Sequence, residues 1–71
     1  MLINGTKIRE LRKDANMTLE EVAVAAGISF ATLSYIESGK KTCSVEVLYR
    51  IAHHFGLLVD DLIRKPLTEK A

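Results

Sequence analysis

The stretch LEEVAVAAGISFATLSYIES, residues 19–38, decides the fold of this chain. Apolar residues spaced three and four apart line one face of a helix, and the stretch contains two such sets. They are separated by Gly27, and glycine readily adopts the positive φ that a chain leaving a helix often needs. The stretch therefore predicts two short helices joined by a tight turn. The inward-facing residues are Val22, Ala23 and Ala26 in the first helix and Leu33 and Ile36 in the second.

The register of these residues resembles the phage repressor and Cro-like helix-turn-helix family, also called the xenobiotic-response-element family. That family favours alanine at the fifth position of a motif of about twenty residues, glycine at the ninth, and aliphatic residues at the fourth, tenth, fifteenth and eighteenth. The flank agrees, because the family's first helix often carries the string Ile-Arg-x-Leu-Arg, which residues 8–12 match. The resemblance covers about residues 4–63. The motif positions are occupied by Val22, Ala23, Gly27, Ile28, Leu33 and Ile36.

The fold that this resemblance implies is an all-α, compact, five-helix domain of the lambda-repressor type. Capping residues and apolar stripes at helical spacing mark the helices in the sequence, and the fifth is a short helix over residues 59–63. We expect one helix-turn-helix domain over residues 1–71, with its core at about 4–63 and a tail over 64–71. The expected N-caps are Asn4, Thr18, Ser29 and Ser44.

The composition is that of a small globular domain without a membrane span. Apolar residues make up 48% of the 71 residues, but no uninterrupted apolar run approaches the ~20 residues that a membrane span needs. The chain does not begin with a basic segment followed by an apolar core, so we expect no signal peptide. The single cysteine, Cys43, cannot form an internal disulfide, which agrees with a reducing, cytoplasmic location.

Double-stranded DNA is the partner that the resemblance implies, with the second helix of the motif in the major groove. A helix turns about 100° per residue, so Ala31 and Tyr35 point outward when the apolar stripe of this helix points inward. The outward side chains include no Arg, Lys, Asn or Gln, so the strong bidentate contacts with guanine and adenine are missing. We therefore predict modest direct readout and an A·T-leaning site, with DNA shape adding discrimination. The implied base contacts are Phe30, Ala31, Ser34 and Tyr35.

Phosphate contacts are expected around the two helix N-termini of the motif and in the loop that follows it. The net charge is only +1, less than in many nucleic-acid binders, but basic residues gather on the first helix and just past the motif. Leu19 stands where the family often has a glutamine, so its backbone N–H is the expected donor at that position. The implied phosphate contacts are Thr18, Leu19, Ser29, Thr32, Ser38, Lys40 and Lys41.

A structural ion pair between the first helix and the end of the recognition helix is also typical of the family. Arg12 and Glu37 occupy the two positions here. We expect this pair to fix the recognition helix to the scaffold. If the pair is partly buried, removal of one partner would strand a charge and cost several kcal/mol.

Several of these residues have simpler interpretations. Phe30 can be a partly buried core aromatic, and Tyr35 can cover apolar surface with its hydroxyl in water. Lys40 and Lys41 can form a solvated loop. A second function also stays open, in which the exposed face of the recognition helix binds a partner protein instead of DNA. An enzyme is not expected, because a small helical bundle leaves little room for a closed substrate pocket.

No cofactor, metal or small-molecule ligand is expected. Adjacent residues on a helix point about 100° apart, so His53 and His54 chelate one ion poorly. Cys43 lies ten residues before His53, and no further Cys or His completes a tetrahedral set.

A homodimer on DNA is expected, because small members of the family usually bind as symmetric dimers. Apolar residues that the core does not need would form the contact between subunits. The expected role is that of a transcriptional regulator, with repression as the more direct outcome. The candidates for the dimer contact are Val24, Leu58, Ile63 and Leu67.

Overall fold

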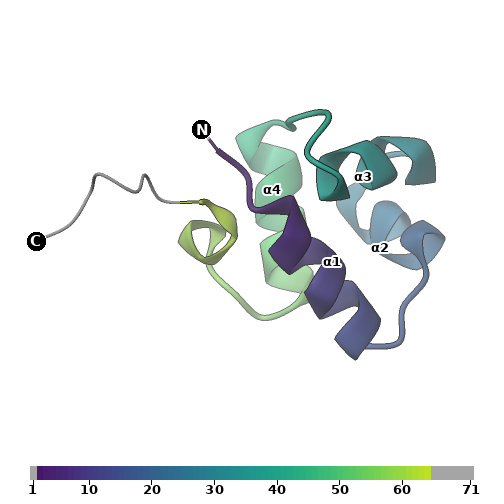
Figure 1. Cartoon of the computed structure of the whole chain (residues 1–71). Coiled ribbons are helices and arrows are strands. Elements are labelled where there is room, and N and C mark those ends of the chain that lie inside the picture. Colours follow the sequence, from purple (N-terminus) through teal and green to yellow (C-terminus); the bar gives the residue numbers. More distant parts are fainter. Residues whose placement is uncertain (1, 65–71) are drawn as a thin grey trace, which may run out of the picture.

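The computed structural model describes residues 2–64, which form four α-helices and one 3-10 helix. The elements are α1 (Gly5–Asp14), α2 (Leu19–Ala26), α3 (Phe30–Glu37), α4 (Val45–His54) and η1 (Val59–Leu62). α2 packs against α3 and α4, while α1 packs against α3 and η1. In Figure 1, α2 and α3 lie together at one end of the molecule and η1 lies at the other. The all-α fold class is therefore confirmed.

The fifth element differs from the expected helix. η1 is a 3-10 helix of 4 residues, Val59–Leu62, rather than an α-helix. Leu58 precedes it and has no side-chain oxygen that could accept an N–H of the first turn, so the segment lacks a good α-helical start. The carboxylate of Asp61 instead accepts the backbone N–H of Leu58 at 2.9 Å. The expectation of five helices is corrected to four α-helices and a 3-10 turn.

The core takes apolar side chains from every helix. Ten apolar residues of the described chain are buried, and each exposes 2% of its surface or less. Leu62 is one of them, so η1 closes the core although it is short. Full burial of an aliphatic side chain contributes roughly 1.5–3 kcal/mol. The buried residues are Ile8, Val22, Ala23, Ala26, Leu33, Ile36, Leu48, Ile51, Ala52 and Leu62.

Polar N-caps fix where the helices begin. Thr18 and Glu21 satisfy each other at the start of α2: Thr18 N–H donates to Glu21 Oε1 at 2.8 Å, and Glu21 N–H donates to Thr18 Oγ1 at 3.1 Å. Ser29 caps α3 by accepting the N–H of Thr32 at 3.1 Å. A cap of this kind typically stabilises a protein by about 1 kcal/mol. The other two expected caps are Asn4 for α1 and Ser44 for α4.

The segment before α1 pairs with the segment after η1. Ile3 and Ile63 form an antiparallel bridge, and the Asn4 N–H donates to the Leu62 carbonyl at 2.8 Å. Ile63 is partly buried and packs against the core. Ile63 therefore contributes to the fold as well as being a candidate for the dimer contact, and its role in a dimer stays a prediction.

The same pairing moves the expected end of the ordered core by one residue. The Arg64 N–H donates to the Leu2 carbonyl at 2.6 Å. Residue 64 therefore belongs to the fold, whereas it was expected to begin the tail. Leu67, the other C-terminal candidate for a dimer contact, lies outside the described residues.

Gly5 is the first residue of α1, and its backbone lies directly against the end of α3. This position therefore has no room for a side chain. A Cβ added to Gly5 would lie 2.8 Å from the carbonyl oxygen of Glu37 and closer still to that of Ile36. Both oxygens belong to the backbone, so neither can move aside as a flexible side chain would. The contact brings the N-terminus of α1 to the C-terminus of α3, where the opposite ends of two helix dipoles attract.

Among the described residues, no single helix is long and apolar enough to cross a membrane. α2 and α3 meet that test of length and composition only when taken together, and the chain bends by 102° between them.

Candidate nucleic-acid interface

The turn after α2 sets the direction of α3. Gly27 has φ 74° and ψ 30°, the left-handed conformation that the sequence predicts for it. The Ile28 N–H donates to the Ala23 carbonyl at 3.0 Å, so one of the free carbonyl groups at the end of α2 has a hydrogen-bond partner. As a result, α3 leaves at 102° to α2, an angle typical of helix-turn-helix pairs.

One side of α3 is buried and the other is exposed. Leu33 and Ile36 expose 0% and 1% of their surface, whereas Phe30 and Tyr35 expose 54% and 44%. Phe30 is therefore a surface aromatic and not a core residue. The exposed side of α3, called the reading face below, consists of the four residues predicted to contact bases: Phe30, Ala31, Ser34 and Tyr35.

Lys41 adds a positive charge to the reading face. Its Nζ lies 5.3 Å from the centroid of the Tyr35 ring, where the electrons of the ring attract a cation. The loop folds back onto α3 because the Lys40 and Lys41 N–H groups both donate to the Tyr35 carbonyl, at 2.8 and 3.3 Å. The sequence gives no signal for this contact, since a loop separates the two side chains. The outward positions of α3 alone therefore understate the charge of this surface.

Hydroxyl groups at both ends of α3 are already hydrogen bonded within the protein. Ser29 Oγ lies 2.9 Å from Thr32 Oγ1, and this pair keeps one hydroxyl hydrogen for a ligand because only one is used between them. Ser38 donates its hydroxyl hydrogen to the Tyr35 carbonyl at 3.1 Å. A phosphate contact in which Ser38 donates would first have to break that bond.

The N-terminus of α2 presents two backbone donors. The N–H groups of Leu19 and Glu20 have no acceptor among the described residues, whereas the Thr18 N–H donates to Glu21. Free N–H groups at the start of a helix favour an anion. Glu20 and Glu21 lie in the same first turn, so a nearby cation is needed to offset their charge.

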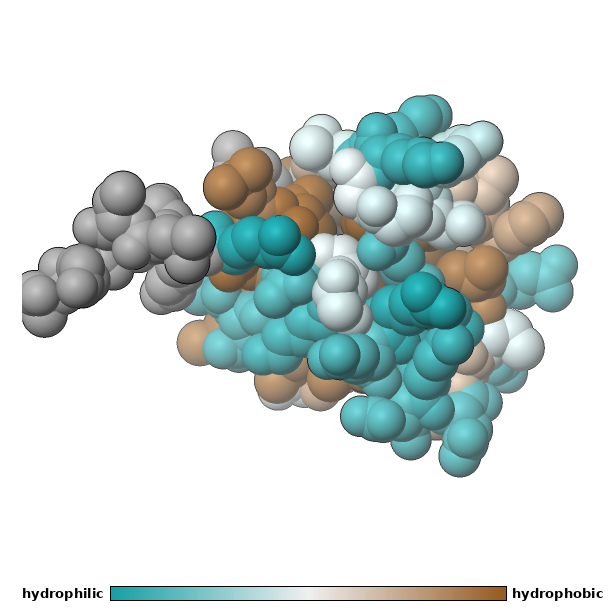
Figure 2. Space-filling view, in the orientation of Figure 1, coloured by the Kyte–Doolittle hydropathy of each residue, from teal (hydrophilic) through white to brown (hydrophobic). Residues whose placement is uncertain are grey.

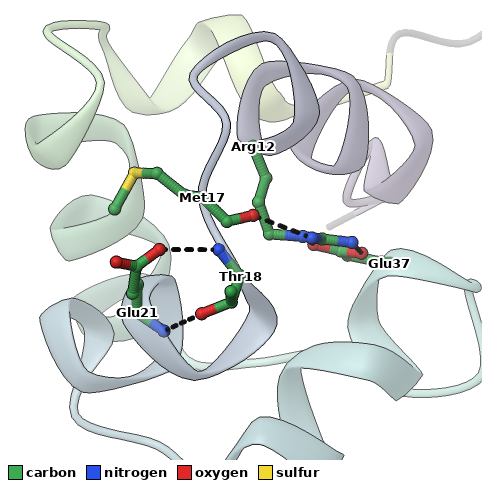
Figure 3. A network of polar contacts seen from close by, with 5 residues as sticks. All are labelled: Arg12, Met17, Thr18, Glu21 and Glu37. Atoms are coloured by element: carbon green, nitrogen blue, oxygen red, sulfur yellow. Dashed lines mark hydrogen bonds and ion pairs between the residues drawn. The ribbon is translucent and has the colours of Figure 1, made fainter.

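Arg12 connects α3 with the segment that leads into α2 (Figure 3). Its Nε donates to Glu37 Oε2 at 2.8 Å and its Nη2 donates to Glu37 Oε1 at 3.1 Å. Nη1 donates to the Met17 carbonyl at 3.0 Å. The hydrogen bond with Glu37 raises the pKa of Arg12 above its ordinary value, and burial opposes this shift. The two residues that the family typically pairs are thus in direct contact here.

A polar hollow of about 250 Å³ opens beside this ion pair, between α1, the start of α2 and α3. Figure 2 shows hydrophilic side chains gathered over α1, which forms one wall. Arg9, which is not among the predicted DNA contacts, lines the hollow one helical turn before Arg12. That spacing is the signal in the sequence that could have found it. The lining residues are Arg9, Arg12, Leu19, Ser34, Glu37 and Ser38.

Metal-ligating side chains do not gather in the described part of the chain: no three His, Cys, Asp or Glu residues there could hold one ion. His54 Nε2 lies 3.2 Å from Met17 Sδ, and His53 stacks on Tyr49 with 5.8 Å between ring centroids. Burial raises the pKa of the Cys43 thiol. The raised pKa leaves less of the thiolate at a given pH, and the thiolate is the form that acts as nucleophile and metal ligand.

The helix-turn-helix family model matches residues 8–62. The chain belongs to this family. The match extends from α1 to the end of η1, so it includes both helices of the motif and both members of the Arg12–Glu37 pair. The resemblance to the xenobiotic-response-element type of helix-turn-helix regulator is thereby confirmed.

Several relatives of this chain are also named as HTH-type transcriptional regulators. Two uncharacterized HTH-type transcriptional regulators from Archaeoglobus fulgidus are 37% and 39% identical to it over 57 residues, which cover 80% of this chain and 80% and 81% of theirs. The HTH-type transcriptional regulator DdrOP3 from Deinococcus deserti is 39% identical over 57 residues, which cover 80% of this chain and 44% of DdrOP3.

Solved structures of regulators have the same helix-turn-helix fold. The clp gene regulator ClgR from Corynebacterium glutamicum superposes with a TM-score of 0.74 at 38% identity, covering 80% of this chain and 61% of ClgR. The regulator SinR in complex with DNA superposes with a TM-score of 0.73 at 27% identity, covering 82% of this chain and 94% of that one. Family and fold together support a DNA-binding regulator.

Proposed function

We propose that this protein regulates transcription by binding duplex DNA with α3 in the major groove, and that it represses by occupying its site. The observation that carries the proposal is the exposed reading face of α3, which stands at 102° to α2. The major groove of B-DNA is about 12 Å wide and admits an α-helix. The shared fold with DNA-bound SinR supports this docking. Such a regulator acts in the cytoplasm, where bacterial and archaeal DNA is found.

Base recognition is proposed for the reading face. Phe30 and Ala31 offer apolar contact to thymine methyl groups, while the hydroxyls of Ser34 and Tyr35 offer single hydrogen bonds. Lys41, beside the Tyr35 ring, adds an ammonium group that donates to a guanine edge or to a phosphate. We expect an A·T-rich half-site, with a G·C pair only where Lys41 reaches a base.

Phosphate binding is proposed for the groups around the reading face. The free N–H of Leu19 and the spare hydroxyl hydrogen of the Ser29–Thr32 pair are donors of the right kind, as is the Thr18 hydroxyl. Each phosphate that a lysine neutralises adds about 0.9 to the slope of log affinity against log salt. Ser38 is the weakest of the proposed contacts, because its hydrogen is already donated. The lysines are Lys40 and Lys41.

A homodimer on DNA is part of the proposal. Val24 and Leu58 expose 80% and 73% of their surface, so both remain available for a contact between subunits. A symmetric dimer places its two recognition helices about 34 Å apart, one turn of DNA. Sedimentation with and without duplex DNA tests this. A monomer mass that does not change with concentration, even with DNA present, contradicts the dimer.

In vitro selection of bound duplexes, followed by fluorescence anisotropy titrations, tests the proposed function. We expect an enriched A·T-rich inverted repeat and a fall in affinity of about 10² between 50 and 200 mM salt, because the two subunits of a dimer bring four lysines to phosphates. Absence of binding at about 50 mM salt would contradict the proposal and favour a partner protein on the reading face. A G·C-rich half-site would contradict the proposed base contacts but not DNA binding.

A further inference from the structure

Arg9 supplies the unbalanced charge of the hollow beside α3. Arg9 and Arg12 bring two positive charges to its lining and Glu37 brings one negative charge, which leaves one positive charge. The Arg12 charge is balanced by Glu37, with Nε and Oε2 2.8 Å apart. Arg9 forms no ion pair within residues 2–64. Its guanidinium is therefore available to a ligand with one negative charge.

The hollow suits a small anion rather than a larger molecule. Its volume of about 250 Å³ is below the range of about 300–1,000 Å³ that is typical of pockets for small molecules. Three elements bring donors to it: α1 brings the Arg9 guanidinium, α2 brings its N-terminus at Leu19, and α3 brings the Ser34 hydroxyl. A guanidinium donates two parallel hydrogen bonds to a phosphate, which fixes orientation as well as charge.

Ser34 connects the hollow to the DNA interface, because it lines the hollow and also belongs to the reading face. A DNA strand that contacts Ser34 would therefore lie beside the hollow. Glu20 and Glu21 lie in the first turn of α2 and repel a phosphate, so a phosphate bound beside that turn needs a cation such as Arg9.

We infer that Arg9 binds a DNA backbone phosphate in this hollow and thereby positions α3 in the groove. The inference rests on the proposed function, since it requires that α3 binds duplex DNA. It adds a contact from α1 to those around the motif. Arg9 acts as a positioning residue, because a phosphate contact carries no base identity.

The test compares Arg9→Gln with Arg50→Gln in the full chain, using a fluorescein-labelled duplex selected by the wild-type protein. Both changes remove one positive charge, but Arg50 lies on α4, outside the hollow, and is paired with Glu46 at 2.7 Å. The dimer carries two copies of Arg9, so we expect Arg9→Gln to weaken binding roughly a hundredfold, about tenfold for each half-site, and to lower the salt slope by about 2. We expect Arg50→Gln to leave the salt slope unchanged and to alter the affinity by no more than about twofold, as for exposed charges away from an interface.

Two further measurements separate a phosphate contact from a general effect on folding. Arg9→Lys keeps the charge but not the fork of donors, so it should retain the salt slope and only part of the affinity. When single phosphates are replaced by neutral methylphosphonates, the wild type should lose affinity at one position per half-site, and Arg9→Gln should be indifferent to that position.

If the wild type binds DNA and Arg9→Gln matches its affinity, its salt slope and its dependence on every phosphate, the inference about Arg9 is wrong and the proposed function still stands. If the wild type does not bind duplex DNA at about 50 mM salt, the proposed function fails and this inference fails with it.

Discussion

Arg12 and Glu37 are joined by two hydrogen bonds across 25 residues of sequence, Nε to Oε2 at 2.8 Å and Nη2 to Oε1 at 3.1 Å. The same guanidinium donates to the Met17 carbonyl at 3.0 Å. A single side chain of α1 therefore holds the end of α3 and the segment that leads into α2. We propose that both α2 and α3 contact DNA, so the pair links the stability of the fold to the geometry of the interface.

Replacement of Arg12 should destabilise the protein strongly. The two side chains expose only 12% and 6% of their surface, so Arg12→Ala leaves the Glu37 carboxylate buried without its partner. The expected loss in free energy of unfolding is about 3–5 kcal/mol, measured by urea unfolding followed by circular dichroism. Arg9→Ala on the same helix is the control and should change stability by less than about 1 kcal/mol. Equal midpoints for Arg12→Ala and the wild type would reject the structural role of the pair.

The stabilisation by Arg12 should not depend on pH near neutrality. The hydrogen bond with Glu37 raises the pKa of Arg12 in the folded state. A base with a raised pKa contributes stability that is fully present below its unfolded pKa and is lost as pH rises through the folded value. Both values lie in the strongly alkaline range. Urea titrations at about pH 6, 7.5 and 9 should thus give the same difference between wild type and Arg12→Ala. A difference that disappears by pH 9 would contradict this account.

Gly5→Ala should destabilise the protein although alanine favours helices. In an exposed helix, replacing glycine by alanine typically raises the free energy of unfolding by up to about 1 kcal/mol. Here the added Cβ meets the backbone oxygens of Ile36 and Glu37, and overpacking of this kind costs about 1–3 kcal/mol. Thermal unfolding of Gly5→Ala and of its exposed neighbour Thr6→Ala as a control measures the effect. A raised midpoint for Gly5→Ala would mean that α1 does not lie against the end of α3.

Thr18→Ala should lower stability by about 1 kcal/mol through the loss of the N-cap of α2. Thr18→Ser keeps the hydroxyl that accepts the Glu21 N–H at 3.1 Å, so it should retain most of that stability. Thermal midpoints of the two variants decide the matter. If alanine and serine behave alike, the cap contributes nothing measurable to the helix.

Cys43 should react slowly with thiol reagents in the folded protein. Burial raises the pKa of its thiol, so less thiolate is present at a given pH than in the unfolded chain. The rate with Ellman's reagent at about pH 8 should be lower in buffer than in concentrated urea. The same rate in both, after correction for the effect of urea on a model thiol, would contradict the burial of this residue.

The helix-turn-helix core could be predicted because its signals are local. Gly27 adopts the left-handed conformation, Thr18 and Ser29 cap the helices they precede, and Leu33 is buried. Each of these follows from spacing or capping within a few residues. Family resemblance supplied the pairing of Arg12 with a distant glutamate, which no local pattern contains.

The remaining features could not be predicted because they depend on which distant segments meet. The contact of Lys41 with the Tyr35 ring requires the loop to fold back, and the hollow that Arg9 lines exists only where three helices meet. The pairing of Ile63 with Ile3 was not predicted for the same reason, since Ile3 lies at the other end of the chain. Apolar residues near a terminus are assigned to the surface or the core only once their contacts are known.

The measurement that tests the central claim most directly is DNA binding by Ala31→Glu, compared with Ala25→Glu. Both alanines are exposed, Ala31 on the reading face of α3 and Ala25 on α2, so both variants should fold. A carboxylate facing the major groove is repelled by the DNA, so Ala31→Glu should bind the selected duplex at least tenfold more weakly, a penalty of about 1.4 kcal/mol or more. Ala25→Glu should bind within about twofold of the wild type, as expected for an exposed charge outside the reading face. Wild-type affinity in Ala31→Glu, with an unchanged unfolding midpoint, would contradict the account.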